Sequence, residues 1–142
     1  MFELFNEIGI IEQLSRTAFE AVMTDGMTLP QFSVLNHLVR VGDGRTPLAI
    51  ARAFQVPKTS MSHTLAKLDQ ADLIEMRPNP EDGRGKLVFI TAKGRAARES
   101  AIHALAPEIA QILPVFTVQE AAALLPGLRK LREFLDKARD PL

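Results

Sequence analysis

The chain has 142 residues, a formal net charge of zero, 46% apolar residues and no cysteine. This length suits one domain that buries most of its apolar surface, and the composition is ordinary for a soluble globular protein. The lack of cysteine excludes disulfides, thiolate zinc sites and a cysteine-based redox switch.

No apolar run approaches the roughly 18 residues that a membrane-spanning helix needs. The N-terminus carries Glu3 and Glu7 where a signal peptide would carry positive charge, so we expect a cytoplasmic protein with no membrane contact. The zero net charge hides an uneven distribution. Residues 40–98 contain eleven Lys or Arg and six Asp or Glu, a balance of +5, and the remainder carries −5. A basic middle between acidic ends indicates a local contact with nucleic acid.

Two amphipathic helices are predicted before the basic middle. The first covers residues 1 to about 23 and should end around residues 24–26, where Gly26 favours a stop. The second opens at Thr28-Leu29-Pro30 and continues to about Val41. On the first helix, one face carries Phe5, Ile8, Ile11 or Glu12, Phe19 and Val22. On the second, the residues expected to face inward are Phe32, Leu35, Leu38 and Val39. Gly42-Asp43-Gly44 should form a turn, and Arg45-Thr46 is a candidate short strand.

Residues 46–70 have the pattern of a helix-turn-helix. Thr46 can cap the first helix with Pro47 at its first position, and Leu48, Ala51 and Phe54 fall on one face. Pro57 ends that helix and can open the next one. In the second helix we expect Met61, Leu65 and Leu68 to be buried. The remaining polar face, suited to reading a major groove, consists of Lys58, Thr59, Ser60, Ser62, His63 and Lys67.

A β-hairpin should follow, with strands at residues 73–77 and 86–91. The segment between them holds two prolines, two glycines and the pair Asp82-Gly83, which favours a tight turn. Arg84 is thus expected near the tip of a wing.

Two more helices complete the prediction. Thr91 should cap a helix from about Ala92 to Leu113, in which Pro107 suggests a kink or a break. Thr117 and Glu120 form a capping box for a last helix that runs to about Ala138, with a bend near Pro126. Its apolar stripe consists of Leu124, Leu128, Leu131 and Leu135.

These features together resemble the MarR family of bacterial winged-helix transcription regulators over nearly the whole chain. The segments that carry the resemblance are residues 29–35, Ile50-Ala51 with Val56, residues 69–74, Asp82-Gly83-Arg84 and residues 90–94. The resemblance implies a mainly α fold with a small β wing, in which N- and C-terminal helices form an intertwined dimerisation domain. We therefore expect a winged helix-turn-helix region at 28–98 and dimerisation helices at 1–24 and 99–142.

The resemblance also implies a regulator, a repressor by expectation, that binds a pseudo-palindromic double-stranded DNA operator as a homodimer. Matched positions that face DNA in the family are Lys58, Ser60, Ser62 and His63, and Thr59 and Lys67 belong to the same set. Arg84 would enter the minor groove, Asp82 would support the wing, and Lys86, Arg77 and Arg95 are weaker phosphate candidates. Three departures from the family pattern, Gln55, Pro57 and His63, prevent any transfer of sequence preference.

The same resemblance implies a dimer interface and an effector. Expected interface residues are Phe5, Ile8, Ile112, Leu124, Leu128, Leu131 and Leu135. The leucine stripe has a second interpretation, in which it closes the chain's own core. Family members often bind a small aromatic or phenolic acid, but no pocket residue can be chosen from this sequence. The direction of regulation and the regulated operon are likewise unreadable.

Two other function classes are disfavoured by the sequence. No nucleophile with a base, phosphate loop or metal-ligand cluster is present, and His37, His63 and His103 fall in three different helices, so we expect neither an enzyme nor a cofactor. The alternative is a winged helix that binds protein instead of DNA. The arginine at the wing tip and the serines on the recognition face argue against it.

Overall fold

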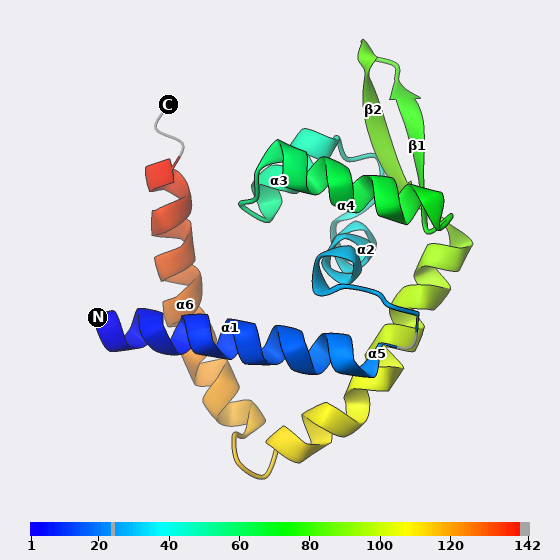
Figure 1. The fold of residues 1–142 in the computed structure, drawn as a ribbon. Coiled ribbons are helices and arrows are strands. Elements are labelled where there is room, and N and C mark those ends of the chain that lie inside the picture. The colour runs from blue at the N-terminus through cyan, green and yellow to red at the C-terminus, as the bar shows by residue number, and fades with distance from the viewer. Residues whose placement is uncertain (24, 140–142) are drawn as a thin grey trace. The chain divides into compact units, whose positions relative to one another are not determined.

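The computed structural model describes residues 1–23 and 25–139, and they fall into two compact units, residues 1–105 and 106–142. These described residues are mainly helical with one two-stranded antiparallel sheet (Figure 1). This agrees with the expected fold class. The elements are α1 (Phe2–Val22), α2 (Leu29–Val41), α3 (Pro47–Ala53), α4 (Lys58–Gln70), β1 (Ile74–Asn79), β2 (Asp82–Ile90), α5 (Ala92–Ile112) and α6 (Val118–Arg139).

Threonine caps the start of α2, α3, α5 and α6, as the sequence predicts. Thr28 forms a capping box with Gln31, because its hydroxyl accepts the Gln31 N–H while its own N–H donates to the Gln31 side chain. The hydroxyls of Thr46 and Thr91 accept from Ala49 N (3.1 Å) and Gly94 N (2.9 Å). Pro57 stands at the N-cap of α4 rather than inside its first turn.

The core of the first unit lies between α2, α3, α4 and the base of the hairpin. Its members include the predicted Met61, Leu65 and Leu68, together with Leu35, Leu38, Ile50, Val88 and Ile90. Leu48, which helical spacing places on one face with Ala51 and Phe54, is 45% exposed. The buried stripe of α3 is centred on Ile50, and Leu48 lies about 200° around the helix from it.

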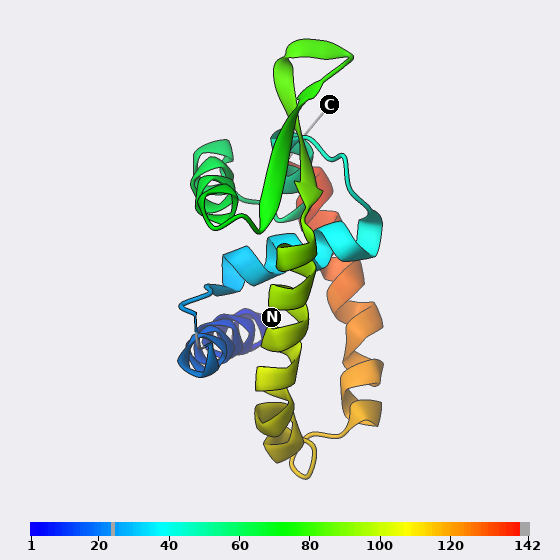
Figure 2. The ribbon, with the colours of Figure 1, turned by 90° about the vertical axis from the view of Figure 1, so that its right-hand side faces the viewer.

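The wing hairpin stands out from the helices of the first unit (Figure 2). Its register runs from Ile74↔Ile90 to Pro78↔Lys86 and then shifts, so that Asn79 pairs with Asp82. The turn falls at residues 80–81, so the prediction of a turn at Asp82-Gly83 is wrong. Asp82 and Gly83 belong to β2, and residues 83–85 bulge out between the last two pairs.

The expected short strand is present as a single bridge between Arg45 and Val88. It lies directly after the turn at Gly42-Asp43-Gly44, where both glycines have positive φ. The bridge joins the segment between α2 and α3 to the outer edge of β2.

The long terminal helices are mostly exposed. In α1 only Phe19 is buried, with its ring 5.1 Å from that of Phe32. The helix ends at Val22. The sequence predicts the stop around residues 24–26; residue 24 lies outside the described residues, and Gly26 has a φ of +66°. The break considered at Pro107 is absent, because α5 is continuous through it, and α6 is likewise continuous through Pro126. A helix can accommodate one proline at the loss of a hydrogen bond.

Candidate DNA-binding surface

Helix α4 divides cleanly into a buried stripe and an exposed polar face. Met61, Leu65 and Leu68 anchor it to the core, since these positions recur every three or four residues. The opposite face is exposed and carries all six predicted contact residues: Lys58, Thr59, Ser60, Ser62, His63 and Lys67. One further polar residue, Thr64, is half-buried and donates its hydroxyl to Ser60 O (3.2 Å). The sequence therefore places the polar face correctly.

The first turn of α4 presents free backbone amides to solvent. Pro57 provides no side-chain hydrogen bond to this end, and the first intrahelical bond runs from Met61 N to Pro57 O (3.1 Å). Lys58, Thr59 and Ser60 are exposed around these amides. Uncapped amides and the positive end of the helix dipole favour a negatively charged group such as a phosphate.

The wing tip holds Arg84 within the three-residue bulge. The Asp82 carboxylate accepts the Arg84 backbone N–H (3.1 Å), and the Asn79 side chain accepts from Glu81 N (3.0 Å). Gly85 lies beside the Asp82 side chain, because a Cβ added to Gly85 would be 3.2 Å from Asp82 Oδ2. Asp82 thus organises the backbone of the bulge and leaves the Arg84 guanidinium free to point away.

The basic side chains of the first unit separate into two groups. Some are used inside the fold: Arg77 lies 4.2 Å from the Phe89 ring centre and 2.9 Å from Glu75, and Lys93 donates to Ala71 O (2.7 Å). The hydrogen bond with Arg77 lowers the pKa of the Glu75 carboxyl and raises the pKa of the guanidinium. Arg95 contacts Asp43.

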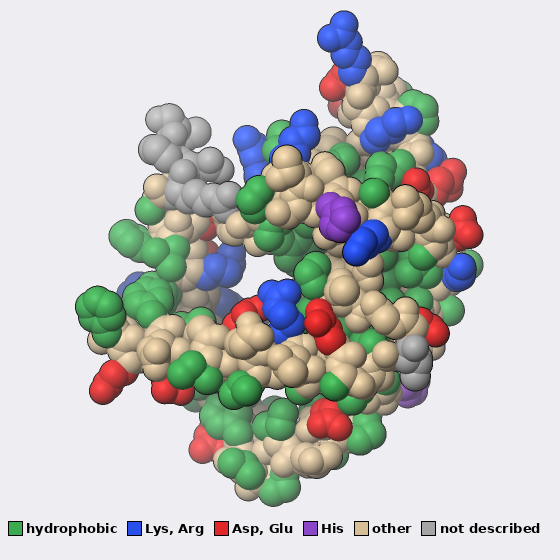
Figure 3. Space-filling model, in the orientation of Figure 1, with side chains coloured by type: hydrophobic (Ala, Val, Ile, Leu, Met, Phe, Trp, Pro, Cys, Tyr) green, Lys and Arg blue, Asp and Glu red, His purple; other side chains and the backbone are tan. Residues whose placement is uncertain are grey.

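The second group has no such role. Within the described residues, no hydrogen bond or ion pair is formed by the side chains of Lys58, Lys67, Arg84 and Lys86. Lysine and arginine side chains gather over α3, α4 and the outer wing, while acidic ones lie nearer the junction of α4 with the hairpin (Figure 3). Unpaired cations on exposed elements are suited to phosphate contacts.

A small cleft lies between α1, α2 and α4. Its volume is about 220 Å³, and the side chains that line it include Arg16, Gln31, His63 and Lys67. Sequence reasoning did not identify these residues as a group, because Arg16 is separated from His63 by two intervening helices. The lining brings the side chains of Arg16, His63 and Lys67 to one concave surface together with the Glu20 carboxylate.

The three histidines do not form a site. His37 of α2 packs edge-on against Phe54, and burial lowers its pKa, with Arg45 and Arg40 adding to the effect. His63 lies on α4 and His103 on α5. No group of three or more metal-ligating side chains occurs among residues 1–23 and 25–139, and no helix in that part of the chain is long and apolar enough to cross a bilayer.

Comparison with known proteins agrees with this geometry. A family model described as MarR family matches residues 25–85. The chain is 25% identical over 133 residues to the transcriptional activatory protein BadR of Rhodopseudomonas palustris, in a match that covers 89% of this chain and 74% of that protein.

Among solved structures, a mutant MarR from E. coli complexed with operator DNA is 26% identical, with a TM-score of 0.78 and coverage of 91% of this chain and 93% of that one. The transcriptional regulator BldR from Sulfolobus solfataricus has a TM-score of 0.81 at 24% identity, covering 93% and 94% of the two chains. The second likeness concerns the fold alone.

Proposed function

This chain belongs to the MarR family of winged helix-turn-helix transcription regulators, and on that premise we propose that it binds a pseudo-palindromic DNA operator as a homodimer. The observation that carries the proposal is the pairing of an exposed polar face on α4 with an unpaired arginine on the wing bulge. Both elements project from one core. They provide one contact for each of two neighbouring grooves.

Helix α4 would lie in the major groove. Lys58 would donate to guanine or phosphate, and the hydroxyls of Ser60 and Ser62 would contact bases or phosphates. His63 would donate to a purine or to the backbone, with Lys67 on phosphate. The free amides before Met61 add a phosphate contact that carries no sequence information.

The wing would reach the adjacent minor groove. A narrow minor groove concentrates negative potential and attracts an inserted guanidinium. Arg84 has that chemistry at an exposed tip, and the Asp82 carboxylate holds the backbone around it. Lys86 is placed to contact phosphate beside it.

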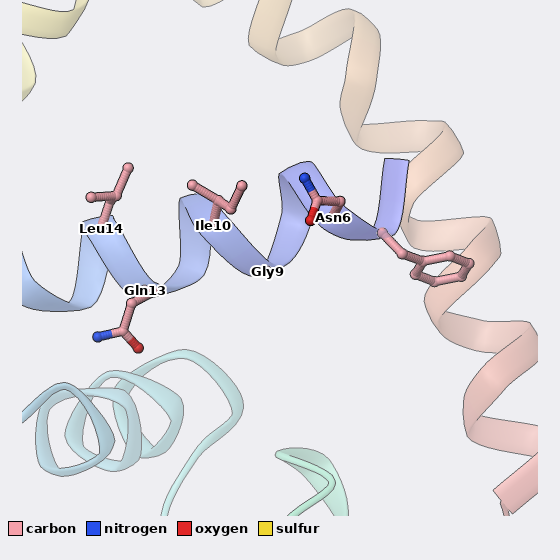
Figure 4. A pocket seen from close by; sticks show the side chains of 6 residues that line it. Asn6, Gly9, Ile10, Gln13 and Leu14 are labelled. Carbon is pink, nitrogen blue, oxygen red and sulfur yellow. The ribbon is translucent and has the colours of Figure 1, made fainter. Parts of the chain in front are cut away.

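Exposed apolar faces support the homodimer. In α1, the labelled side chains of Ile10 and Leu14 extend from one side of the helix (Figure 4), beside a hollow of about 420 Å³ whose six lining residues all belong to α1. A hollow lined by a single helix is an open face rather than an enclosed site. In α6, Leu124 is 55% and Leu135 47% exposed, which argues against a stripe that closes the chain's own core. The proposed interface is Phe5, Ile8, Ile112, Leu124, Leu128, Leu131 and Leu135.

The test is a titration of the purified protein against a duplex that it selects from a random-sequence library, at several salt concentrations. We expect two chains per duplex and affinity that falls steeply with salt. Arg84→Ala should lose about 1–3 kcal/mol of binding free energy. Arg129→Ala, which removes an exposed arginine from α6, is the matched control and should bind like wild type.

Failure to select any duplex, with Arg84→Ala indistinguishable from wild type, would contradict the proposal. It would favour a winged helix that binds protein, a class that the zero net charge of the chain also permits. Capture of a partner protein through the wing would then be the next measurement.

The direction of regulation is proposed to be repression. Deleting the gene should then raise expression from a reporter that carries the selected operator. A fall in reporter expression would instead match the activatory description of the relative BadR.

An effector is proposed to bind in the cleft between α1, α2 and α4. Arg16, His63 and Lys67 outnumber the one carboxylate in its lining, Glu20, and suit the carboxylate of a small aromatic or phenolic acid, which would compete with Glu12 for Arg16. His63 and Lys67 also belong to the DNA-binding face. A ligand bound in this cleft would therefore favour the DNA-free state of the protein over the DNA-bound state. Salicylate is a suitable probe: it should weaken operator binding by wild type and have less effect on Arg16→Ala.

A further inference from the structure

The turn between α2 and α3 carries a carboxylate that reaches the base of the wing. Asp43 lies between Gly42 and Gly44, whose positive φ values of 96° and 75° bend the chain sharply. Its Oδ1 accepts the backbone N–H of Ile90 at 2.8 Å, across 47 residues of sequence. Its Oδ2 lies 3.4 Å from the Arg95 guanidinium, and its side chain is 29% exposed.

This carboxylate extends a hydrogen-bond ladder along the edge of β2. Gly44 N donates to Val88 O (3.0 Å), and Val88 N donates to Arg45 O (2.9 Å). In a strand, alternate residues direct their N–H groups to the same edge, so those of Val88 and Ile90 both face the turn. The Asp43 side chain therefore takes the place of the next carbonyl that a longer third strand would supply.

The ladder joins the wing to the helix-turn-helix at a point far from the tip. At the same base Val88 and Ile90 are buried in the core, and beyond them the hairpin stands out from the helices (Figure 2). Arg84 lies six residues before Ile90, at most about 20 Å away along β2, because residues 83–85 bulge out. A rotation of about 10° at the base would move a tip at that distance by about 3.5 Å, more than the length of a hydrogen bond.

We propose that Asp43 is a positioning residue that fixes the angle of the wing to α4 and so places Arg84 at the minor groove. The inference rests on the proposed DNA-binding function and adds to it a residue that touches no DNA. The Ile90 hydrogen bond carries most of this role, since the Arg95 partner is 53% exposed and such ion pairs contribute little.

A purely electrostatic role and a positioning role for Asp43 predict opposite changes in DNA affinity when the side chain is removed. Arg77 and Arg95 are the cations that face this carboxylate. Removing its negative charge leaves Arg95 without its ion-pair partner and Arg77 with Glu75 alone, which by attraction to phosphate would strengthen DNA binding. If Asp43 positions the wing, Asp43→Ala should weaken binding instead.

The experiment is a double-mutant cycle on the duplex selected by the wild-type protein. Asp43→Ala should weaken binding at least about 5-fold. Arg84→Ala, expected to cost about 5- to 150-fold in wild type, should cost less than about 2-fold in the Asp43→Ala background. Lys58→Ala should cost the same factor in both backgrounds, because α4 is held by its own buried stripe.

Two variants separate the hydrogen bond from the charge. Asp43→Asn keeps an oxygen that can accept from Ile90 N and should restore both the affinity and the full Arg84 effect. Arg95→Ala, which removes only the ion pair, should preserve the Arg84 effect. Asp69→Asn removes one exposed acid from α4 and is the control for charge; it should bind at least as tightly as wild type.

Backbone NMR relaxation provides a measurement that needs no DNA. Asp43→Ala should increase the mobility of the hairpin at residues 75–89 while that of α4 stays unchanged, and Asp43→Asn should reverse the increase. An equal Arg84 effect in both backgrounds, or an unchanged hairpin, would overturn the inference. Absence of any selected duplex would contradict the DNA-binding function itself, and the relaxation result would still decide whether Asp43 holds the wing.

Discussion

Gly94 occupies a position in the first turn of α5 where no side chain fits. A Cβ placed on it would lie 2.0 Å from the carbonyl oxygen of Leu73 and 2.9 Å from an Ile90 side-chain carbon. Backbone cannot move aside cheaply, so Gly94→Ala should lower the free energy of unfolding by roughly 3 kcal/mol. Urea denaturation followed by circular dichroism measures this loss.

The control for this prediction is another helical glycine with open space around it. Gly127 lies inside α6, and a Cβ added to it would meet no atom within 4 Å. Gly127→Ala should stabilise the protein by about 0.5–1 kcal/mol, because alanine loses less backbone entropy in a helix. The two glycine-to-alanine substitutions should therefore change the free energy of unfolding in opposite directions. Equal changes would contradict the steric argument.

Single residues are predictable from sequence where their role depends on near neighbours. The exposed face of α4 follows from helical spacing, and the threonine caps follow from residues three positions away. Asp43 cannot be identified that way, since its partner Ile90 is 47 residues distant. The buried face of α3 is hard to assign for a related reason: a helix of seven residues offers too few apolar positions to define it.

At the scale of elements, the N-terminus of α6 depends on one reciprocal pair. Thr117 N donates to the Glu120 carboxylate at 2.8 Å, and Glu120 N donates to the Thr117 hydroxyl at 3.2 Å. Thr117→Ala should therefore cost about 1 kcal/mol of stability at neutral pH. Thr17→Ala, which removes an exposed threonine inside α1, is the control and should cost less, because Thr17 donates to Gln13 O and caps no helix end.

The same pair predicts a dependence on pH. Hydrogen bonds from the Thr117 backbone and side chain lower the pKa of Glu120. A lowered pKa in the folded state means that the ionised carboxylate stabilises the fold above its unfolded pKa, and that this contribution is lost as pH falls through the folded value. The difference in free energy of unfolding between wild type and Thr117→Ala, measured by urea denaturation, should thus become smaller below about pH 4. A difference of constant size would show that the carboxylate contributes nothing.

The wing shows how an element can be predicted while its turn is not. Both strands are predictable because residues 73–77 and 86–91, rich in apolar residues, flank a segment rich in proline and glycine. The position of the turn is decided by side-chain hydrogen bonds: Asn79 accepts from Glu81 N, and Asp82 accepts from Arg84 N. These bonds place the turn at 80–81 and make the Asp82-Gly83 pair the start of a bulge.

At the scale of the whole molecule, the uneven charge distribution and the exposed apolar faces serve two different contacts. The +5 balance of residues 40–98 lies on the unit that holds α4 and the wing, whereas the apolar side chains of α6 lie outside it. Net charge alone would argue against DNA. The distribution of charge along the chain, which is available from sequence, corrects that impression. No local sequence pattern, however, can tell whether a leucine stripe packs against its own chain or against a second copy.

The stripe on α6 gives a prediction about assembly. Leu124→Glu with Leu128→Glu places two charges on side chains that are 55% and 37% exposed. Charges buried at a subunit interface without partners are costly, so we expect the mass from light scattering to fall from that of a dimer to the 15.7 kDa of one chain. Loss of the dimer should also weaken binding to an operator with two half-sites, because a monomer contacts one half-site.

The matched control is Leu48→Glu on α3. Leu48 is 45% exposed, close to the value for Leu124, but it lies on the winged helix rather than on a terminal helix. It should leave the dimer mass unchanged. If both variants keep the dimer mass, α6 is not the interface; if wild type itself has the mass of one chain, the homodimer is wrong and the operator must be bound one half-site at a time.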